Sequence, residues 1–375
     1  MLGIDRFLEN KNRFLGMTFA LLSNQASFTS KFIPSEIAIA DAFNLAGIIS
    51  PQHGFFHEAQ ANMIETEPMK HPLLGIPIHP FYSSEPVLPN FIEDVDVVLV
   101  DIQDVGIRVY TYIWSLFKLM ELLKGTDKII FILDRPNPLG GELVEGAPLN
   151  PEFKSFVGLA SIPMIHGMTI GELALMFNET ENFSLEIEVF KANWKRNLTY
   201  EMLKLPWRNP SPNLPTIDTV KAYGGNVIFE GTNISEGRGT TKPFLYVGAP
   251  FINGYMLAKE LEGISGIKFL PIGFSPTFDK YRGELCHGIE LCCFEKGFSP
   301  FKTGLIIAKK IFSLYKQAEF LPPPYEYEYE KLPFDIITGS DKYRKWIQEG
   351  NLSDLHELLD PGEYLSLREE FLLYN

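Results

Sequence analysis

The stretch VDVVLVDIQD, residues 95–104, decides the fold of this chain, because a short β-branched apolar run ends there in a cluster of polar side chains. A continuous run of this kind is typical of a buried strand in a parallel sheet, where both faces are covered and the alternating pattern is lost. Ligands of open parallel sheets bind beyond the carboxyl ends of the strands, so we expect a ligand site at these polar clusters. Three more apolar runs have the same layout: residues 17–22 before SNQ, 46–49 before SPQHG, and 129–133 before DRPN.

Helical periodicity follows at residues 112–123 and 169–177, and strands that alternate with helices predict an α/β fold with a doubly wound, mainly parallel sheet. A length of 375 residues suggests two domains. We place them at residues 1–225 and 226–375, the second being a smaller α+β domain. The later elements expected are helices at 255–261, 303–315 and much of 342–374, strands at 267–272 and 289–294, and a proline-rich loop at 206–216.

The composition narrows the classes of partner. A net charge of −14 without a cluster of basic residues argues against nucleic acid and anionic membranes, and leaves a small molecule or oligosaccharide as the expected ligand. We expect a cytoplasmic protein, or a periplasmic or secreted one if a leader was removed, because the first residues lack a signal-peptide core. The three cysteines, all within 286–293, are read as small hydrophobic residues and not as metal ligands or a disulfide.

The densest group of reactive side chains is DIQDVGIRVYTY, residues 101–112. A strand end followed by Gly106 would let Asp101 and Asp104 project into the crevice beside Gln103. The alternative for Asp104 is a salt bridge with Arg108. Tyr110 could offer a platform for the face of a sugar or could simply pack.

Three further segments supply candidate ligand-binding residues. In LDRPNPLGGELVEG, a rigid loop would hold Arg135 and Asn137 over the cleft, although its prolines need only shape a turn. In PQHGFFHEA, His53 is expected to bond a ligand or backbone groups. In EGTNISEGRGTT, glycine-rich backbone presents two carboxylates, hydroxyls and an arginine, and it lacks the phosphate-loop spacing, so nucleotide binding is unsupported. The candidates in this last segment are Asn233, Glu236 and Arg238.

Glu121 stands alone in YTYIWSLFKLMELL, a helix that is otherwise almost wholly apolar. Burial there would raise its pKa toward the range of a general acid. The alternative is a carboxylate that pairs with Lys118 or Lys124 or reaches solvent. The alternating tyrosines and glutamates of PPPYEYEYEK, residues 322–331, are read as an edge strand with one wet face, in preference to a binding motif.

Taken together, these motifs resemble the NamZ-type exo-β-N-acetylmuramidases, bacterial peptidoglycan hexosaminidases. The resemblance runs through nearly the whole chain and implies a Rossmann-like catalytic domain, a smaller C-terminal domain and a cleft between them. It also implies release of N-acetylmuramic acid from the non-reducing end of peptidoglycan fragments in cell wall recycling, without a cofactor or metal. The motifs that carry it are SNQAS, PQHGF, DIQDVGIRVYTYI, LDRPNPLGGELVEG, FVGLASIPMIHGMTIGELALMFN, PWRNPSPNLPT, FEGTNISEGRGTTKPF and GAPFINGY.

The chain departs from that family at Gln52, because the family pattern is PEHG and this chain has PQHG. Glycosidases usually need two carboxyl groups, and an amide can neither give up a proton nor attack the sugar. Gln52 would thus occupy a catalytic position whose role falls to another carboxylate, or the protein binds muropeptides or related amino sugars without cleaving them. A third reading is a Rossmann-type enzyme that acts on another small molecule. The candidate replacements are Asp101, Asp104, Glu58 and Glu121.

Two expectations can be checked on the structure. The layout of the strands predicts that Gln52, Asp101 and Asn137 line one crevice at the carboxyl edge of the sheet. The lactyl carboxylate of muramic acid calls for a cation, and a forked arginine suits a carboxylate best. The candidates for that cation are Arg238, Arg135 and Arg108.

Overall fold

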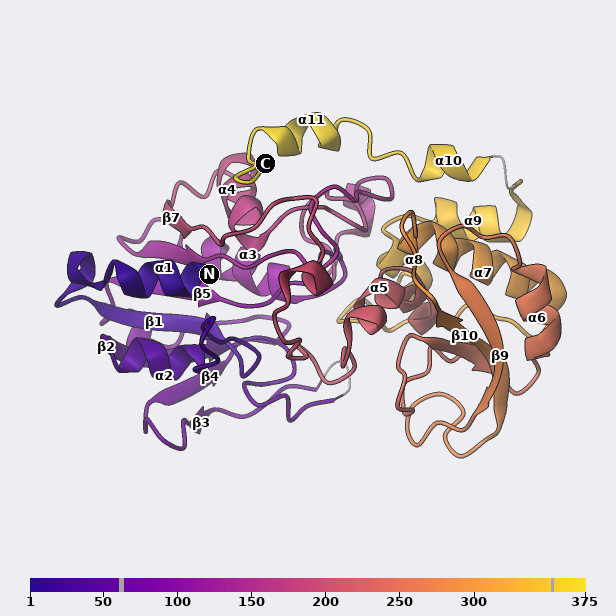
Figure 1. Cartoon of the computed structure of the whole chain (residues 1–375), viewed down its shortest axis with the longest axis horizontal. Coiled ribbons are helices and arrows are strands. Elements are labelled where there is room, and N and C mark those ends of the chain that lie inside the picture. Colours follow the sequence, from indigo (N-terminus) through magenta and orange to yellow (C-terminus); the bar gives the residue numbers. More distant parts are fainter. Residues whose placement is uncertain (61–63, 352–353) are drawn as a thin grey trace.

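The computed structural model describes residues 1–60, 64–351 and 354–375. Figure 1 shows two lobes side by side, an N-terminal lobe built on the larger sheet and a C-terminal lobe with the smaller one. The elements α1 to η4 make up the N-terminal lobe, and α5 to α9 make up the C-terminal lobe.

The sheet of the N-terminal lobe has seven strands in the order β3-β4-β2-β1-β5-β6-β7. All neighbours pair in parallel except β3, which runs antiparallel to β4. The expected α/β fold with a mainly parallel sheet is therefore confirmed. The strands are β1 (Thr18–Ser23), β2 (Asn44–Ser50), β3 (Met69–Lys70), β4 (Pro77–Pro80), β5 (Val97–Asp101), β6 (Ile129–Leu133) and β7 (Glu186–Phe190).

Helices cover both faces of this sheet, which explains why the apolar runs do not alternate. Phe19 and Leu21 pack into a cluster with α1 on one face, while Ala20 and Leu22 pack into a cluster with α3 and α4 on the other. Thr169 caps α4 and forms a capping box with Glu172, as its sequence predicts. The helices and 3-10 helices of this lobe are α1 (Gly3–Glu9), η1 (Lys11–Phe14), α2 (Ser35–Ala40), η2 (Asn90–Ile92), α3 (Tyr112–Leu123), η3 (Pro151–Phe153), α4 (Ile170–Thr180) and η4 (Tyr200–Leu203).

The C-terminal lobe is a small antiparallel sheet with helices around it, in strand order β8-β10-β9. The helices α5 and α7 approach closely, because a Cβ on Gly304 would lie 2.3 Å from the carbonyl oxygen of Gly225. The domain boundary expected between residues 225 and 226 falls at the end of α5 and stays a prediction. The elements are α5 (Ile217–Asn226), η5 (Val227–Gly231), β8 (Tyr246–Ala249), α6 (Gly254–Glu260), β9 (Lys268–Phe274), β10 (Cys286–Cys292), α7 (Pro300–Leu314), α8 (Pro333–Thr338) and α9 (Lys342–Glu349).

The last residues cross back over both lobes and end beside α4 (Figure 1). There the hydroxyl of Tyr374 donates to Asp134, and the backbone amide of Leu373 donates to Glu172. The helix expected over much of 342–374 is divided into α9 and two short pieces, and residues 352–353 lie outside the described part. The pieces are α10 (Leu355–Leu358) and α11 (Tyr364–Glu369).

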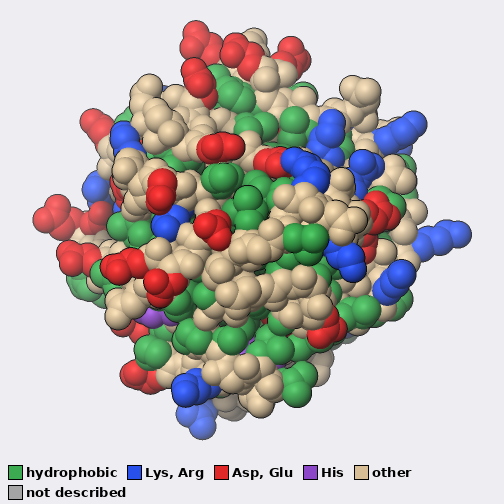
Figure 2. Space-filling model, turned by 90° about the vertical axis from the view of Figure 1, so that its left-hand side faces the viewer, with side chains coloured by type: hydrophobic (Ala, Val, Ile, Leu, Met, Phe, Trp, Pro, Cys, Tyr) green, Lys and Arg blue, Asp and Glu red, His purple; other side chains and the backbone are tan. Residues whose placement is uncertain are grey.

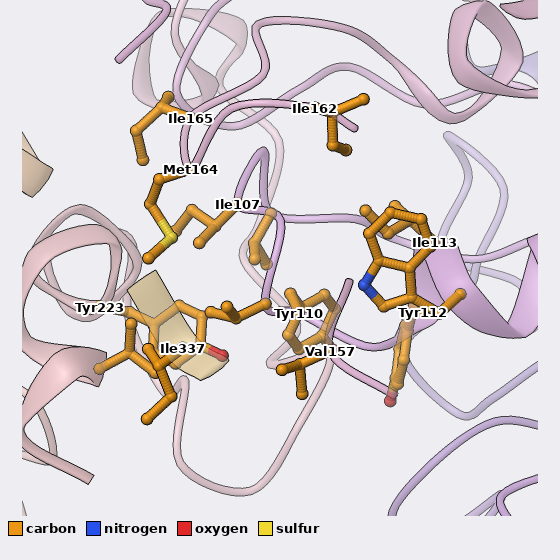
Figure 3. Close-up of a cluster of buried hydrophobic side chains, with 14 of the residues drawn as sticks. Ile107, Tyr110, Tyr112, Ile113, Val157, Ile162, Met164, Ile165, Tyr223 and Ile337 are labelled. Atoms are coloured by element: carbon orange, nitrogen blue, oxygen red, sulfur yellow. The ribbon is translucent and has the colours of Figure 1, made fainter. Parts of the chain in front are cut away.

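A cluster of buried apolar side chains joins the two lobes. Figure 3 shows Ile107, Tyr110 and Ile165 of the N-terminal lobe beside Tyr223 of α5 and Ile337 of α8. Burial of such side chains is worth roughly 1.5–3 kcal/mol each. The shared cluster therefore helps to hold the two lobes together.

The charges on the surface and the length of the helices relate to the expected absence of nucleic-acid and membrane partners. On the face of the N-terminal lobe drawn in Figure 2, acidic side chains predominate toward the left and the top of the view, and basic side chains lie mainly toward the right. Within the described ranges, no helix is both long enough and apolar enough to cross a membrane.

Candidate active site

A pocket of about 430 Å³, partly open to solvent, lies between the lobes where the loops after the strands meet the C-terminal lobe. Its lining comes from segments far apart in the sequence. The residues are Gln52, His53, Val109, Tyr110, Thr111, Val157, Ser211, Asn213, Leu214, Tyr223, Glu230, Arg238, Phe244, Tyr325 and Glu326.

Gln52 follows β2 and is buried in this pocket. Its Oε1 accepts a hydrogen bond from the hydroxyl of Thr111, the residue before α3. Its Nε2 is buried and makes no hydrogen bond of standard geometry among the described residues, although the amide lies close enough to the Glu326 carboxyl to lower its pKa. A buried donor without a well-formed bond costs free energy, so this amide is suited to meet the Glu326 carboxylate or an acceptor on a bound ligand.

His53 lies next to Gln52 and adopts a positive φ of 76°. Its Nδ1 bonds the carbonyl oxygen of Ala59 at 2.8 Å, which makes Nδ1 the protonated nitrogen. Burial lowers the pKa of His53 from 6.5 to about 4 despite this hydrogen bond. The ring is therefore neutral near pH 7, and its Nε2 keeps a lone pair.

Aromatic side chains contribute to the lining, Tyr110 and Tyr223 among them, and Tyr112 packs against Tyr110. The rings of Tyr110 and Tyr112 lie 4.5 Å apart, and Tyr110 meets Tyr223 edge-on at 6.4 Å. Burial raises the pKa of Tyr110 and Tyr223 well above 10, so both stay protonated. A lining of this kind offers apolar ring faces and polar hydroxyls, which suits a sugar.

An ion pair between Arg238 and Glu230 also belongs to the lining. Arg238 Nη2 lies 2.5 Å from Glu230 Oε1, and the hydroxyl of Tyr325 donates to Glu230 Oε2 at 2.6 Å. Burial raises the pKa of Glu230, while Arg238 counteracts the rise. The Nε of Arg238 makes no hydrogen bond within the described residues, and it faces Glu236 Oε1 at 3.7 Å. Two carboxylates therefore hold this guanidinium in the pocket lining.

Behind that pair, Glu236 and Lys280 form a second ion pair at 2.7 Å. Burial would raise the pKa of Glu236, but Lys280 and Arg238 outweigh it and lower the pKa. Glu236 thus supports Arg238 from outside the pocket lining. Asn233 is farther away and bonds the backbone at Gln317 and Glu319.

Glu326 is the most unusual group in the pocket. Its Oε2 accepts a 2.5 Å hydrogen bond from the hydroxyl of Tyr82, and its carboxyl lies near the amide of Gln52. Burial raises the pKa of Glu326 from 4.5 to about 7, against the lowering effects of Tyr82, Arg238 and Gln52. Near neutral pH this carboxyl is present in both protonated and ionised forms, as a proton-transfer group requires.

Asp101, Arg135 and Asn137 do not line the pocket, so the expectation that Gln52, Asp101 and Asn137 share one crevice is wrong for the last two. Asp101 and Arg135 form a buried two-point ion pair, with Nε–Oδ1 at 2.5 Å and Nη2–Oδ2 at 3.0 Å. Asn137 bonds the carbonyl of Met168, and it packs so closely on Gly106 that a Cβ there would lie 2.5 Å from Oδ1. These side chains hold neighbouring loops together.

Gln103, Asp104 and Arg108 also have structural partners. Gln103 Nε2 donates to the carbonyl of Pro136 at 3.1 Å. Asp104 accepts from the Gly106 amide and lies 3.2 Å from His166 Nε2, and it does not pair with Arg108. Arg108 is fully buried and donates to the carbonyls of Ile162 and Ile337, which ties the two lobes. Arg238 is thus the one member of the three proposed arginines that lines this pocket.

Two sequence predictions are wrong. Glu121 is exposed and pairs with Lys118 at 2.8 Å, which is the alternative given above for this residue, so it is not a buried carboxyl. The segment 322–331 is not a strand; it carries an isolated bridge between Tyr325 and Glu328. Its Tyr325 and Glu326 enter the pocket.

Sequence reasoning missed Glu230 and Glu326, the two carboxylates of the pocket lining. Glu230 stands at the start of the glycine-rich segment already singled out. The available signal for Glu326 was the proline-rich start of its segment, which favours a fixed loop over a strand. Together these residues provide a carboxylate held by an arginine and a carboxyl that exchanges its proton near pH 7, beside aromatic side chains.

Comparisons with known proteins identify the family of the chain. The family model described as "Exo-beta-N-acetylmuramidase NamZ, N-terminal" matches residues 19–218, and its C-terminal counterpart matches residues 221–374. A curated relative, "Peptidoglycan beta-N-acetylmuramidase NamZ" of Bacillus subtilis (strain 168), is 36% identical over 99% of this chain and 91% of its own length.

Two crystal structures of DUF1343 family proteins from Bacteroides fragilis NCTC 9343 share the fold. The first is 26% identical with a TM-score of 0.88 and covers 100% of this chain and 98% of its own. The second is 28% identical with a TM-score of 0.75 and covers 100% and 99%. From the two family models and the full-length relative, the chain belongs to the NamZ family of exo-β-N-acetylmuramidases.

Proposed function

We propose that this protein is a glycoside hydrolase that releases N-acetylmuramic acid from the non-reducing end of peptidoglycan fragments. The observation that carries the proposal is the pocket itself, which joins Glu230 and Glu326 with the aromatic residues Tyr110 and Tyr223. Two carboxyl groups are the usual equipment for cleaving a glycosidic bond. The 36% identity to a curated peptidoglycan β-N-acetylmuramidase supports the same chemistry.

The shape of the pocket supports attack at a chain end. Both lobes contribute to the lining of a pocket that is partly open to solvent. An enzyme that cuts within a strand needs a groove open at both ends. A pocket bounded by two lobes favours removal of one sugar at a time.

Arg238 is suited to select muramic acid over glucosamine. Arg238 lines the pocket, and its planar guanidinium has the geometry to bind a lactyl carboxylate. Glu230 and Glu236 already compensate the charge of Arg238. The arginine would therefore contribute directional hydrogen bonds more than net positive charge.

A second function is favoured by one observation, the amide of Gln52. An intact pocket with an amide in place of the family's glutamate would suit a protein that binds muropeptides without cleaving them. This reading requires that neither Glu326 nor Glu230 takes over the missing role.

A chromogenic β-N-acetylmuramide tests the proposal, with the matching β-N-acetylglucosaminide as the control substrate. We expect the wild-type protein to release the chromophore from the muramide and to leave the glucosaminide intact. Binding of N-acetylmuramic acid without release of chromophore would favour the binding protein. Gln52→Glu would then restore hydrolysis by roughly a hundred- to ten-thousand-fold, the usual worth of one general acid or base.

A further inference from the structure

We propose that Glu326 carries the proton transfer of glycoside cleavage in this protein, in the place of the carboxylate that Gln52 has replaced, and that Gln52 positions it. The inference rests on the proposed function. It assigns a catalytic role to a residue in a segment whose sequence resembles an edge strand, and it explains how an enzyme of this family can act with an amide at position 52.

Glu326 and Gln52 are neighbours in the pocket. Glu326 and Gln52 both line the pocket, and they lie close enough for the amide to affect the carboxyl electrostatically. Gln52 is fixed by Thr111, which donates to its Oε1. That bond occupies the acceptor of the amide and leaves Nε2 as its donor, which has no partner of standard geometry in the described part of the chain. The amide can thus stabilise either a ligand oxygen or the ionised form of Glu326.

Glu326 is buried without a cationic partner at ion-pair distance among the described residues. The side chain is 2% exposed, yet it has no lysine or arginine at ion-pair distance within the described ranges, unlike Glu230 with Arg238. Its hydrogen-bond donor is the neutral hydroxyl of Tyr82. A buried carboxyl without a cationic partner holds its proton at higher pH than usual. The ionisable and polar groups that face Glu326 are Tyr82, Glu230, Arg238, Gln52, Tyr223, Tyr325 and Tyr327.

Cleavage of the glycosidic bond by Glu326 requires only water as co-reactant. Protonated Glu326 gives its proton to the glycosidic oxygen while the bond from that oxygen to C1 breaks, and the bonding pair stays on the oxygen. Water then forms the new C1–O bond and passes one proton to the Glu326 carboxylate. The products are free N-acetylmuramic acid and the shortened fragment, and Glu326 is protonated as at the start.

The test compares Glu326→Gln with wild type on two substrates that differ in their leaving group. In the disaccharide N-acetylmuramyl-β-1,4-N-acetylglucosamine, the leaving group is the N-acetylglucosamine alkoxide, which needs a proton. In 4-nitrophenyl β-N-acetylmuramide, the leaving group is 4-nitrophenolate, which is stable without one. We expect Glu326→Gln to lower kcat/KM for the disaccharide at least a hundredfold and to affect the nitrophenyl glycoside at least tenfold less. A merely structural role would lower both equally.

The pH profile gives a second readout. In wild type, kcat/KM for the disaccharide should fall above about pH 7, because Glu326 must be protonated to act. In Glu326→Gln, the residual activity should lack that fall. The control is Glu330→Gln, the same change at an exposed position of the same segment, which should match wild type on both substrates.

The outcomes separate this proposal from the proposed function. If wild type cleaves the disaccharide and Glu326→Gln cleaves it equally well, the role of Glu326 is refuted and the muramidase function stands. If wild type cleaves neither substrate, both are refuted. Binding of N-acetylmuramic acid to Glu326→Gln, measured by calorimetry, shows that the variant is folded; equal losses on both substrates with normal binding would also overturn the proposal.

Discussion

The hydroxyl of Tyr82 donates a 2.5 Å hydrogen bond to the carboxyl of Glu326, a residue 244 positions later in the chain. Tyr82 follows β4 of the N-terminal lobe, while Glu326 belongs to the loop before α8 in the C-terminal lobe. The bond therefore spans the two lobes at the pocket. It couples the placement of a catalytic carboxyl to the way the lobes pack.

Tyr82→Phe should move the alkaline limb of the pH–rate profile upward. The Tyr82 hydrogen bond lowers the pKa of Glu326, so its loss raises that pKa, by about one unit for a bond worth about 1.4 kcal/mol. The measurement is kcat/KM for the disaccharide between pH 5 and 9. Tyr329→Phe, an exposed tyrosine of the same region, is the control. A limb that stays in place or moves to lower pH would contradict the assignment.

Arg238→Lys should weaken the preference for muramic acid. Lysine keeps the charge near Glu230 and Glu236 but loses the forked geometry that recognises a carboxylate. We expect binding of N-acetylmuramic acid to weaken roughly tenfold, about 1.4 kcal/mol, and binding of N-acetylglucosamine to change much less. Calorimetry measures both affinities. Arg344→Lys, in an ion pair with Asp335 away from the pocket lining, is the matched control, and equal losses for both sugars would argue against the assignment.

Asp101→Asn should damage stability and not chemistry. Removing one partner of a buried ion pair leaves Arg135 uncompensated, which costs about 3–5 kcal/mol. Urea unfolding measures this loss. The variant that remains folded should keep kcat within a few-fold of wild type. A hundredfold drop in kcat with unchanged stability would return Asp101 to the list of catalytic groups.

Glu145 should make the stability of the protein depend on pH. Burial raises its pKa from 4.5 to about 7, and its carboxyl accepts from the hydroxyl of Ser299 and the amide of Phe301 at the start of α7. A raised pKa stabilises the fold fully below about pH 4.5, and this contribution of about 3 kcal/mol is lost as the pH rises through 7.

Glu145→Gln removes that titration. Between pH 5 and pH 8, the free energy of unfolding of wild type should therefore fall relative to that of the variant by roughly 3 kcal/mol. Urea unfolding at both values measures the difference. Glu330→Gln should follow wild type, and a parallel response of the Glu145 variant would show that this carboxyl does not titrate in the range.

Much of the fold could be predicted because it depends on local patterns. The four apolar runs are strands β1, β2, β5 and β6, and the helix expected at 112–123 is α3. Thr169 and Glu172 announce α4 through a capping box that is readable in the sequence. These features follow from side chains a few residues apart.

The candidate site could be predicted only in part, because its members meet through lobe packing. Gln52, His53, Tyr110 and Arg238 were found from polar clusters that follow apolar runs or stand among glycines. Asp101 has the same position at a strand end, yet its side chain turns to Arg135 and supports a loop. Position at the sheet edge does not by itself say which side chains reach a ligand.

Glu326 and Glu121 show the same limit from opposite sides. Glu121 stands in an apolar helix, but its place one turn after Lys118 puts it on the exposed face. Glu326 stands among tyrosines in a pattern typical of a wet edge, but packing against Tyr82 buries it. Whether a single carboxylate is buried depends on which distant part of the chain packs against it. The flanking residues do not encode that contact.

Digestion of a defined tetrasaccharide, with N-acetylmuramic acid at the non-reducing end and alternating N-acetylglucosamine, tests the central claim most directly. Mass spectrometry of the earliest products identifies the bond that is cut. The pocket between the lobes and its two carboxyl groups predict free N-acetylmuramic acid together with a trisaccharide that begins with N-acetylglucosamine. Disaccharides as the first products, or a tetrasaccharide that binds and stays intact, would contradict the account.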